Sequence, residues 1–251
     1  MKALIHYSHG LGDVIMLTPL LRKLNQNGYK VDLMCRQSVE TSKLLDECPY
    51  VERLFIVDNP HRSKLGWHEQ QLINDKKMIA MSGDYDYTLR LPHLNLKTCK
   101  ITHNMVKSTL SYSKEDLGLE VFIPKEVELQ ALNYIQKTYP NGYIFNHTQI
   151  EFHPVHNWNS TDYIKKNLPD LPVIDTGLGG SHYRMFPDIN FSFVLAREAE
   201  YRVLSSSVFV HACEAMGSSI EIINYGKPDR KVWPLTPNLV KHIRESESIL
   251  K

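Results

Sequence analysis

The chain has 251 residues, of which 42% are hydrophobic and 23% charged, and its formal net charge is +1. This composition excludes an intrinsically disordered chain, and the near-zero charge argues against binding nucleic acid or a membrane through bulk charge. No apolar stretch is long enough to span a membrane, no signal peptide is visible, and the four cysteines form no CxxC pair (Cys35, Cys48, Cys99, Cys213). We therefore expect a cytoplasmic globular protein with buried thiols.

The most informative motif follows the first predicted strand, residues 3–5. It reads Gly10-Leu-Gly-Asp13 and leads into an apolar run with helical character. Two glycines permit a sharp turn and the close approach of a ligand, while the free amides of a helix start favour an anion. Asp13 is therefore either a helix cap or a group that accepts protons in a reaction.

A dinucleotide-binding turn is the competing interpretation of this motif. That fingerprint needs a third small residue and an acidic residue at the end of the second strand. Ile15 occupies the third position, and the second predicted strand, residues 31–35, ends at Arg36. Both departures argue against a nicotinamide or flavin site.

The first half of the sequence alternates short apolar runs with helical periodicity. Thr18-Pro19 is typical of a helix start and Asn27-Gly28 of a helix end, and the polar stretch 59–84 predicts a lid or variable insert. A helix over 126–138 is followed by the strongest break, at 139–142, which places the domain boundary there. The strands expected in this half are residues 3–5, 31–35, 54–57 and 87–91.

The second half repeats this pattern. Strands are expected at 143–145, 173–174, 208–210 and 220–224, and helices at 161–167, 196–204, 211–216 and 236–250. The fold class is therefore α/β, with two doubly wound Rossmann-like domains facing across a cleft and ligands at the carboxyl ends of the strands. The expected domains are 1–139, 140–235 and a terminal helix, 236–251, that packs back on the first domain.

Segment 9–24 resembles the opening motif of the lipopolysaccharide heptosyltransferases, glycosyltransferase family nine, which have the GT-B fold. Four later segments resemble that family in order: its "YD" strand, its strand, threonine and "K-x-W-P" turn, its "H-x-A-x-A-x-G" helix, and its closing segment (85–91, 144–158, 204–217, 225–234). The resemblance covers most of the chain, but only the first motif is specific.

The sequence departs from the family in three places. His156 stands where the family has lysine, Asn159 stands where it has proline, and the "D-T-G" before the late histidine is absent. An Asp175-Thr-Gly177 sequence occurs one strand earlier. The chain is also shorter than typical members, which suggests trimmed loops and an altered acceptor.

The resemblance implies an inverting, metal-independent transfer of sugar from a nucleotide sugar to an acceptor hydroxyl, with no other cofactor. Asp13 is the expected general base, because the attacking hydroxyl must lose a proton. The charge of the leaving diphosphate needs donors such as Thr148, His156 or a helix start near His211 or Gly217-Ser218. The expected acceptor side is Gly10, Gly12, Arg36 and Arg90, and the expected donor side is Asn146, Thr148, His156, His211, Glu214, Gly217 and Ser218.

Each assignment has a simpler alternative. Asp13 can be a cap alone, Glu214 a solvated helix residue, and the two arginines partners in surface ion pairs. The D-x-D at 84–86 more simply forms a turn. Three aromatic side chains could stack on a ring, but such side chains more often fill cores: Trp67, Tyr85 and Tyr112. Three histidines are spaced like metal ligands but have no carboxylate partner: His147, His153 and His156.

Two other functions stay open at this point. A virus-type DNA glycosyltransferase acting on hydroxymethylated bases would use the same donor chemistry and need a basic groove, for which the candidates are Arg36, Arg62, Lys64, Lys97, Lys100 and Lys107. A non-catalytic protein that binds nucleotides or sugars with a degenerate site would fit the missing lysine and "D-T-G".

Overall fold

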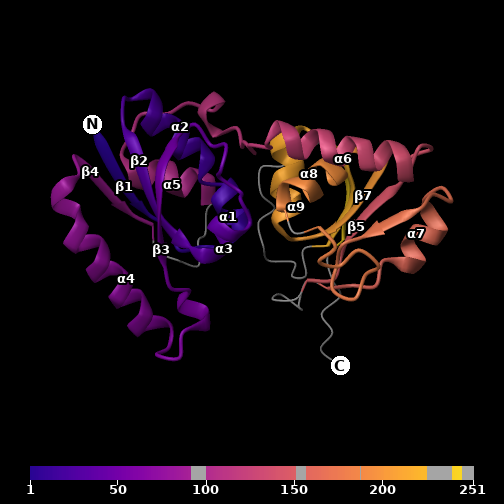
Figure 1. The fold of residues 1–251 in the computed structure, drawn as a ribbon, viewed down its shortest axis with the longest axis horizontal. Helices are drawn as coiled ribbons and strands as arrows, with labels where there is room; N and C mark the ends of the chain where they lie inside the picture. The colour runs from indigo at the N-terminus through magenta and orange to yellow at the C-terminus, as the bar shows by residue number, and fades with distance from the viewer. Residues whose placement is uncertain (92–99, 151–156, 187, 225–238, 245–251) are drawn as a thin grey trace. The chain divides into compact units, whose positions relative to one another are not determined.

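The computed structural model describes residues 1–91, 100–150, 157–186, 188–224 and 239–244. The chain divides into two compact units, residues 1–122 and 123–251, each of which is described by itself (Figure 1). Within the described ranges, no helix has the length and apolar character needed to cross a bilayer.

The first unit contains a parallel sheet with strand order β3-β2-β1-β4. Its members are β1 (Lys2–His6), β2 (Lys30–Arg36), β3 (Val51–Val57) and β4 (Tyr87–Arg90), so all four strands expected here are confirmed. Ala3, Leu4 and Ile5 are fully buried, which explains why the first strand reads as a continuous apolar run.

The helices of this unit include α1 (Leu11–Ile15), α2 (Thr18–Gln26), α3 (Gln37–Thr41), α4 (Trp67–Met81) and α5 (Lys100–Ser108). The expected end of α2 at Asn27 is confirmed, but its N-cap is Leu17, because the Thr18 hydroxyl instead donates to the Ile15 carbonyl at 2.8 Å. The glycine turn lies before α2, at the start of the short separate helix α1.

The stretch 59–84, predicted to be a lid or variable insert, is mostly the helix α4. Its buried face carries amides rather than apolar residues, so no helical hydrophobic period is visible. Asn74 is fully buried; its amide donates to the Asp58 carbonyl at 3.0 Å and accepts from Gln70 at 3.2 Å. Near its other end, Met78 packs against the sheet.

The second unit also contains a parallel sheet, with order β6-β5-β7-β8-β9. The strands are β5 (Ile144–His147), β6 (Val173–Asp175), β7 (Tyr201–Ser205), β8 (Ile220–Asn224) and β9 (Val240–Arg244). The helices α6 (Lys125–Thr138) and α7 (Thr161–Asn167) confirm two further predictions.

Three predictions for this unit are wrong. The helix expected over 196–204 is α8 (Ile189–Glu198) followed by β7, and the strand expected at 208–210 is the first turn of α9 (Val208–Met216). Where a helix is expected over 236–250, residues Val240–Arg244 form the strand β9 instead. Val240 and Ile243 of this strand pair with Ile220 and Ile223 of β8. In each case tertiary pairing overrides a short local pattern.

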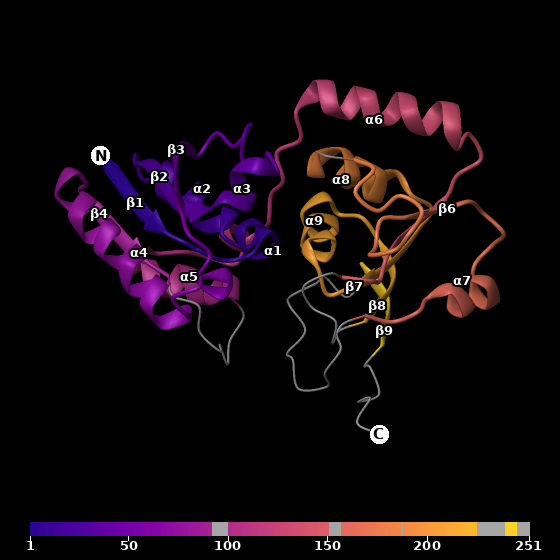
Figure 2. The ribbon, with the colours of Figure 1, turned by 60° about the horizontal axis from the view of Figure 1, so that its bottom comes forward.

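The helix α6 lies against α8, as both views show (Figures 1 and 2). An ion pair of 2.7 Å joins Arg197 to Glu128, and Ala131 is fully buried. The division between the compact units therefore falls before α6, whereas the break at 139–142 had placed the boundary after it.

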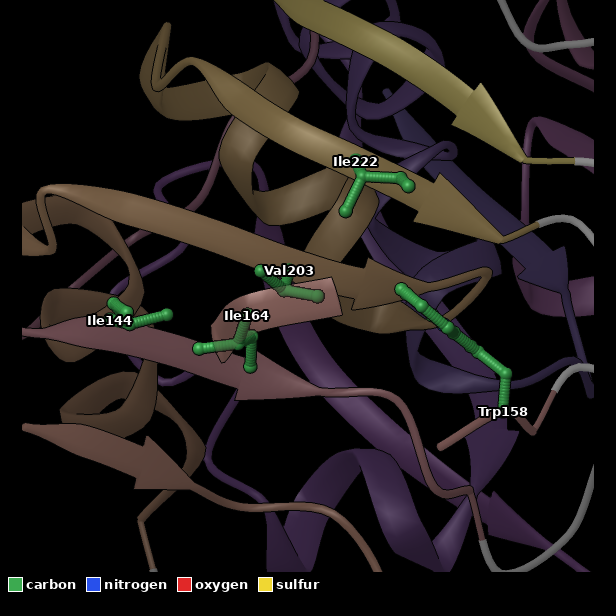
Figure 3. Close-up of a cluster of buried hydrophobic side chains, with 5 residues drawn as sticks. All are labelled: Ile144, Trp158, Ile164, Val203 and Ile222. Carbon is green, nitrogen blue, oxygen red and sulfur yellow. The ribbon is translucent and has the colours of Figure 1, made fainter. Parts of the chain in front are cut away.

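Trp158 of the expected "K-x-W-P" turn lies in the core of this unit. It is 8% exposed and belongs to a cluster contributed by β5, α7, β7 and β8 (Figure 3). The cluster residues are Ile144, Trp158, Ile164, Val203 and Ile222. This indole therefore stabilises the fold rather than offering a surface for stacking.

In each sheet the strand order reverses at one position. The chain steps from β1 to β2 to β3 and then returns to the free side of β1 with β4; in the second unit it steps from β5 to β6 and returns with β7. Crevices at such switch points, at the carboxyl ends of the strands, are where doubly wound folds bind ligands. The switch points lie between β1 and β4 and between β5 and β7.

Candidate functional site

The first switch point holds the glycine turn. Gly10 has extended backbone before α1, and its amide donates to Asp13 Oδ2 at 3.1 Å, while the Val14 amide donates to the Gly10 carbonyl at 3.1 Å. Asp13 therefore does cap this turn, as the simpler interpretation expects. Its side chain is nevertheless 22% exposed, so one part of the carboxylate stays open to solvent.

Lys100 is the partner of Asp13 that the sequence did not assign to this site. Its Nζ lies 2.6 Å from Asp13 Oδ1, and its side chain is 11% exposed. The lysine begins α5, a helix that is not among those predicted from the sequence, where Lys100 is a candidate only for a basic groove. A search for a lysine at the start of the helix after β4 would have found it.

His9 completes this cluster. Its Nε2 lies 2.9 Å from the Leu91 carbonyl just beyond β4, and its Nδ1 lies 3.5 Å from Lys100 Nζ and 3.9 Å from Asp13 Oδ2. The cluster of His9, Asp13 and Lys100 therefore joins the β1–α1 turn to the end of β4 and the start of α5. A partly exposed carboxylate beside a buried ammonium and a buried imidazole at a switch point is typical of a site for proton transfer.

Tyr7 lies beneath the cluster. Its ring stacks on His9 with centroids 4.1 Å apart, and its hydroxyl accepts from the Asn104 amide at 3.5 Å. Burial, together with the negative charge of Asp13, raises the pKa of Tyr7 well above its usual value. The phenol is therefore neutral and acts as a support for the imidazole.

The two arginines expected on the acceptor side differ in their surroundings. Arg36 Nε donates to the Ser8 carbonyl at 2.6 Å, and burial lowers the pKa of Arg36 while the charge of Asp13 opposes that shift. Arg36 thus adjoins the same turn. Arg90 instead pairs with Asp75 of α4 at 2.6 Å, as the ion-pair alternative expects.

In the second unit, Asn146 and Thr148 are 4% and 1% exposed, respectively, and face inward. Asn146 Oδ1 accepts from Ser160 at 2.9 Å and from Thr148 at 3.3 Å, while the Thr148 carbonyl accepts from Ser205 at 2.9 Å. These bonds tie β5 to the start of α7 and to β7. Both side chains therefore hold the strand ends in place.

The neighbouring His147 and Thr176 also lie at the second switch point. His147 Nδ1 and Thr176 Oγ1 are 3.1 Å apart, and the imidazole packs on Phe209 of α9 at 4.6 Å between centroids. Burial lowers the pKa of His147 to about 4, so its ring is neutral at pH 7. The Asp175-Thr-Gly177 sequence therefore belongs to this edge of the sheet.

The loop after β6 folds closely around Asp175. The Gly177 amide donates to Asp175 Oδ1 at 3.0 Å, and a Cβ on Gly180 would lie 2.5 Å from Asp175 Cγ. Only glycine fits at that position without displacement of its neighbours. This packing holds Thr176 beside His147.

The helix α9 begins at this edge with Ser207 as its N-cap. Residues 205–207 are three consecutive serines, and Ser207 Oγ is buried with no hydrogen-bond partner among the residues described. His211 follows one turn later and is 7% exposed, with Glu214 one turn beyond it. The amino end of α9 thus offers backbone amides and hydroxyls.

The expectation of a helix start at Gly217-Ser218 is wrong. Gly217 has φ 67° and ends α9, and the Ser218 amide donates to the Cys213 carbonyl at 2.9 Å. Since β8 runs parallel to β7 and starts at Ile220, these two residues lie at the opposite edge of the sheet from Ser207. They form a helix C-cap.

The remaining candidate residues from the sequence either lie outside the described residues or have structural contacts. His153, His156, Lys97, Cys99 and the closing segment 225–234 lie outside the described residues. In the D-x-D sequence, Tyr85 donates to Asp32 at 2.6 Å and Asp86 accepts from the Lys2 amide at 2.7 Å, so this segment is structural. In the part of the chain that the structure describes, no group of three or more metal-binding side chains lies together.

The expected groove cations do not share one environment. Arg36 and Lys100 are turned toward Ser8 and Asp13, whereas Arg62, Lys64 and Lys107 are exposed. The cysteines that the structure describes, Cys35, Cys48 and Cys213, are reduced and buried, as expected. Burial raises the pKa of Cys48 to about 11 and that of the other two to about 12, so these thiols are inert near neutral pH.

Comparison with solved structures identifies the fold. The chain superposes on Escherichia coli ADP-heptose lipopolysaccharide heptosyltransferase II with a TM-score of 0.63 at 13% identity, covering 97% of this chain and 89% of that one. A glycosyltransferase family 9 structure from Veillonella parvula gives a TM-score of 0.61 at 13% identity, covering 98% and 86%. E. coli heptosyltransferase WaaC with ADP-2-deoxy-2-fluoro heptose gives 0.60 at 14% identity, covering 97% and 93%.

These likenesses establish that the chain has the fold of these glycosyltransferases, two α/β units with parallel sheets. The expected fold class is confirmed in that respect. No family model and no curated protein sequence matches the chain. The fold is therefore recognisable in three dimensions where the sequence has diverged.

Proposed function

We propose that this protein is a glycosyltransferase that moves a sugar from a nucleotide sugar to an acceptor hydroxyl, with Asp13 as the general base. The observation that carries the proposal is the partly exposed carboxylate of Asp13, held by Lys100 and Gly10 at a switch point of a fold shared with heptosyltransferases. Donor-bound WaaC, one of the similar structures, supports a nucleotide sugar as the donor.

The proposed reaction is a single displacement. The acceptor oxygen forms a bond to the anomeric carbon of the sugar as the bond from that carbon to the phosphate oxygen breaks. Asp13 takes the proton of the acceptor hydroxyl, and the nucleoside diphosphate leaves with the electron pair of the broken bond. Attack opposite the leaving group inverts the configuration at that carbon.

The departing diphosphate gathers negative charge, which the protein must stabilise. The amino end of α9, with Ser207 as its cap, supplies backbone amides and a hydroxyl, and Thr176 adds a second hydroxyl beside His147. We infer that these groups, without a bound metal, meet the diphosphate. Arg36, adjoining the Asp13 turn, provides a cation for a phosphate or carboxylate on a carbohydrate acceptor.

The experiment is turnover with a panel of nucleotide sugars in the presence of EDTA, comparing wild type with Asp13→Asn. The variant keeps an oxygen to accept from Gly10 but loses the base, so we expect kcat to fall by about 10²-fold or more. Nucleotide-sugar binding, measured by thermal shift, should be retained.

Asp116→Asn is the matched control, because Asp116 also pairs with a lysine, Lys23 at 3.0 Å, and also accepts a backbone amide, Ser113 at 2.8 Å. It should retain the wild-type rate. Binding of a nucleotide sugar without transfer or hydrolysis by the wild type would support the binding-protein alternative instead. Loss of activity with EDTA would contradict the metal-free mechanism.

A further inference from the structure

The carboxylate of Asp13 is held through both of its oxygens. Lys100 Nζ donates to Oδ1 at 2.6 Å and the Gly10 amide donates to Oδ2 at 3.1 Å. Two donors on two oxygens fix the plane of the carboxylate. We infer that Lys100 is a positioning residue that orients Asp13 and keeps it ionised, and that His9 in turn positions the ammonium of Lys100.

The hydrogen bonds of His9 define its tautomer. A carbonyl oxygen only accepts, so the 2.9 Å contact with Leu91 places a proton on Nε2. Nδ1 then carries a lone pair directed at the Lys100 ammonium, 3.5 Å away. The imidazole thus accepts from Lys100 at the same time as Lys100 donates to Asp13.

The start of α5 is packed against this cluster. Asn104, one turn after Lys100, is 2% exposed and donates to the hydroxyl of Tyr7, which stacks on His9. On the same helix, Ile101 and Met105 are 4% and 0% exposed, respectively. The ammonium therefore stands on a rigid element, which is what precise orientation of a base requires.

A purely structural role explains this arrangement less well. Burying the Lys100 ammonium beside a partly buried carboxylate has a desolvation cost, and apolar residues often serve stability as well or better. The titratable and charged groups that face Asp13 include Tyr7 and His9 from its own side of the turn, Lys100 from α5, and Arg36 from the end of β2. Of these, Lys100 makes the short contact with the carboxylate.

The inference rests on the proposed function where it concerns catalysis, so one of its tests is independent of activity. In ¹³C NMR titrations of the side-chain carboxyl of Asp13, Lys100→Met should shift the titration to higher pH, because removal of a nearby cation disfavours the charged carboxylate. Lys107→Met is the matched control: it makes the same substitution at an exposed lysine of the same helix and should leave the titration unchanged.

In transfer assays, Lys100→Met should lower kcat by about 10²-fold with little change in the donor KM, and the acid limb of the kcat profile should move to higher pH. Lys100→Arg retains the positive charge and should recover part of the rate with an acid limb close to that of wild type. His9→Phe, which keeps a ring but loses the acceptor, should lower kcat less than Lys100→Met does.

The outcomes separate the two ideas. An Asp13 titration and a kcat profile that are unchanged in Lys100→Met would overturn the role of Lys100, while an inactive Asp13→Asn would still support the proposed function. A wild type that turns over no nucleotide sugar would defeat the proposed function, yet the NMR titration would still test the positioning of Asp13.

Discussion

His147 illustrates how burial fixes the charge of a side chain at the candidate donor site. Its ring lies between Thr176 and Phe209, and its pKa falls from the ordinary 6.5 to about 4. Neutral imidazole at this position donates or accepts hydrogen bonds without adding a cation. Transfer should therefore not depend on protonation of His147 near neutral pH.

The same shift predicts acid sensitivity of the fold. The unfolded chain takes up the proton of His147 near pH 6.5 and the folded chain only near pH 4, so the unfolding free energy falls as the pH is lowered through that window. The loss attributable to His147 should be about 3 kcal/mol. Burial also lowers the pKa of His6, His103 and His182, which act in the same direction.

Urea unfolding at several pH values tests this prediction. His147→Asn should flatten the pH dependence between 6.5 and 4 relative to wild type, because asparagine keeps a polar group but does not titrate. Equal slopes for the two proteins would mean that the imidazole is not protonated differently in the folded and unfolded states.

At the scale of single elements, the Trp158 side chain makes the clearest energetic prediction. It packs with Ile144, Val203 and Ile222 from three strands (Figure 3). The Arg244 guanidinium lies 4.7 Å from its ring centroid. Trp158→Ala should destabilise the protein by about 3–5 kcal/mol through the cavity that it leaves. Trp158→Phe, which fills part of that cavity, should lose less.

Chemical denaturation and nucleotide binding together measure this effect. A structural tryptophan predicts a lowered unfolding free energy with unchanged affinity in the folded protein. An unchanged free energy with a loss of binding would instead make Trp158 a ligand contact.

Elements also show what the sequence can and cannot predict. The apolar runs at β1, β2 and β8 mark buried parallel strands, because such strands have both faces covered; Asp32 interrupts the run of β2 and Glu221 that of β8. The helix α4 is not predicted from the sequence because amides such as Asn74 occupy its buried face. The start of α9 is predicted as a strand because Val208, Phe209 and Val210 favour a strand locally. Long-range packing decides such cases.

The candidate site shows the same difference between local signals, which the sequence reveals, and long-range contacts, which it does not. The glycine turn is a local signal, so the sequence locates Asp13 and its cap. The partnership with Lys100 joins positions that are 87 apart in the chain and has no local signature. Likewise Thr176 and His147 meet only because β5 and β6 are neighbours in the sheet.

At the scale of the whole molecule, the division at residue 122 predicts which fragments fold. Fragment 123–251 retains α6, whose Tyr134 packs on Phe191 at 5.8 Å and whose Glu128 pairs with Arg197. It should give a cooperative thermal transition and dispersed NMR spectra. Fragment 140–251 exposes the surface of α8 that α6 covers and should aggregate or melt without cooperativity.

Circular dichroism melts and two-dimensional NMR of both fragments measure the difference. Fragment 1–122 is the companion control, since its own sheet and α2 are buried without α6. A cooperative 140–251 together with an unfolded 123–251 would contradict the division and favour a boundary after α6.

The reversal of strand order in both sheets has a consequence for how such proteins diverge. The described parts of the loops and helices that carry His9, Asp13, Lys100, Thr176 and Ser207 take part in no strand register. They can lengthen, shorten or change chemistry while the pairing beneath them persists. Natural selection can therefore reshape substrate choice without rebuilding the scaffold, which agrees with a TM-score of 0.63 maintained at 13% identity.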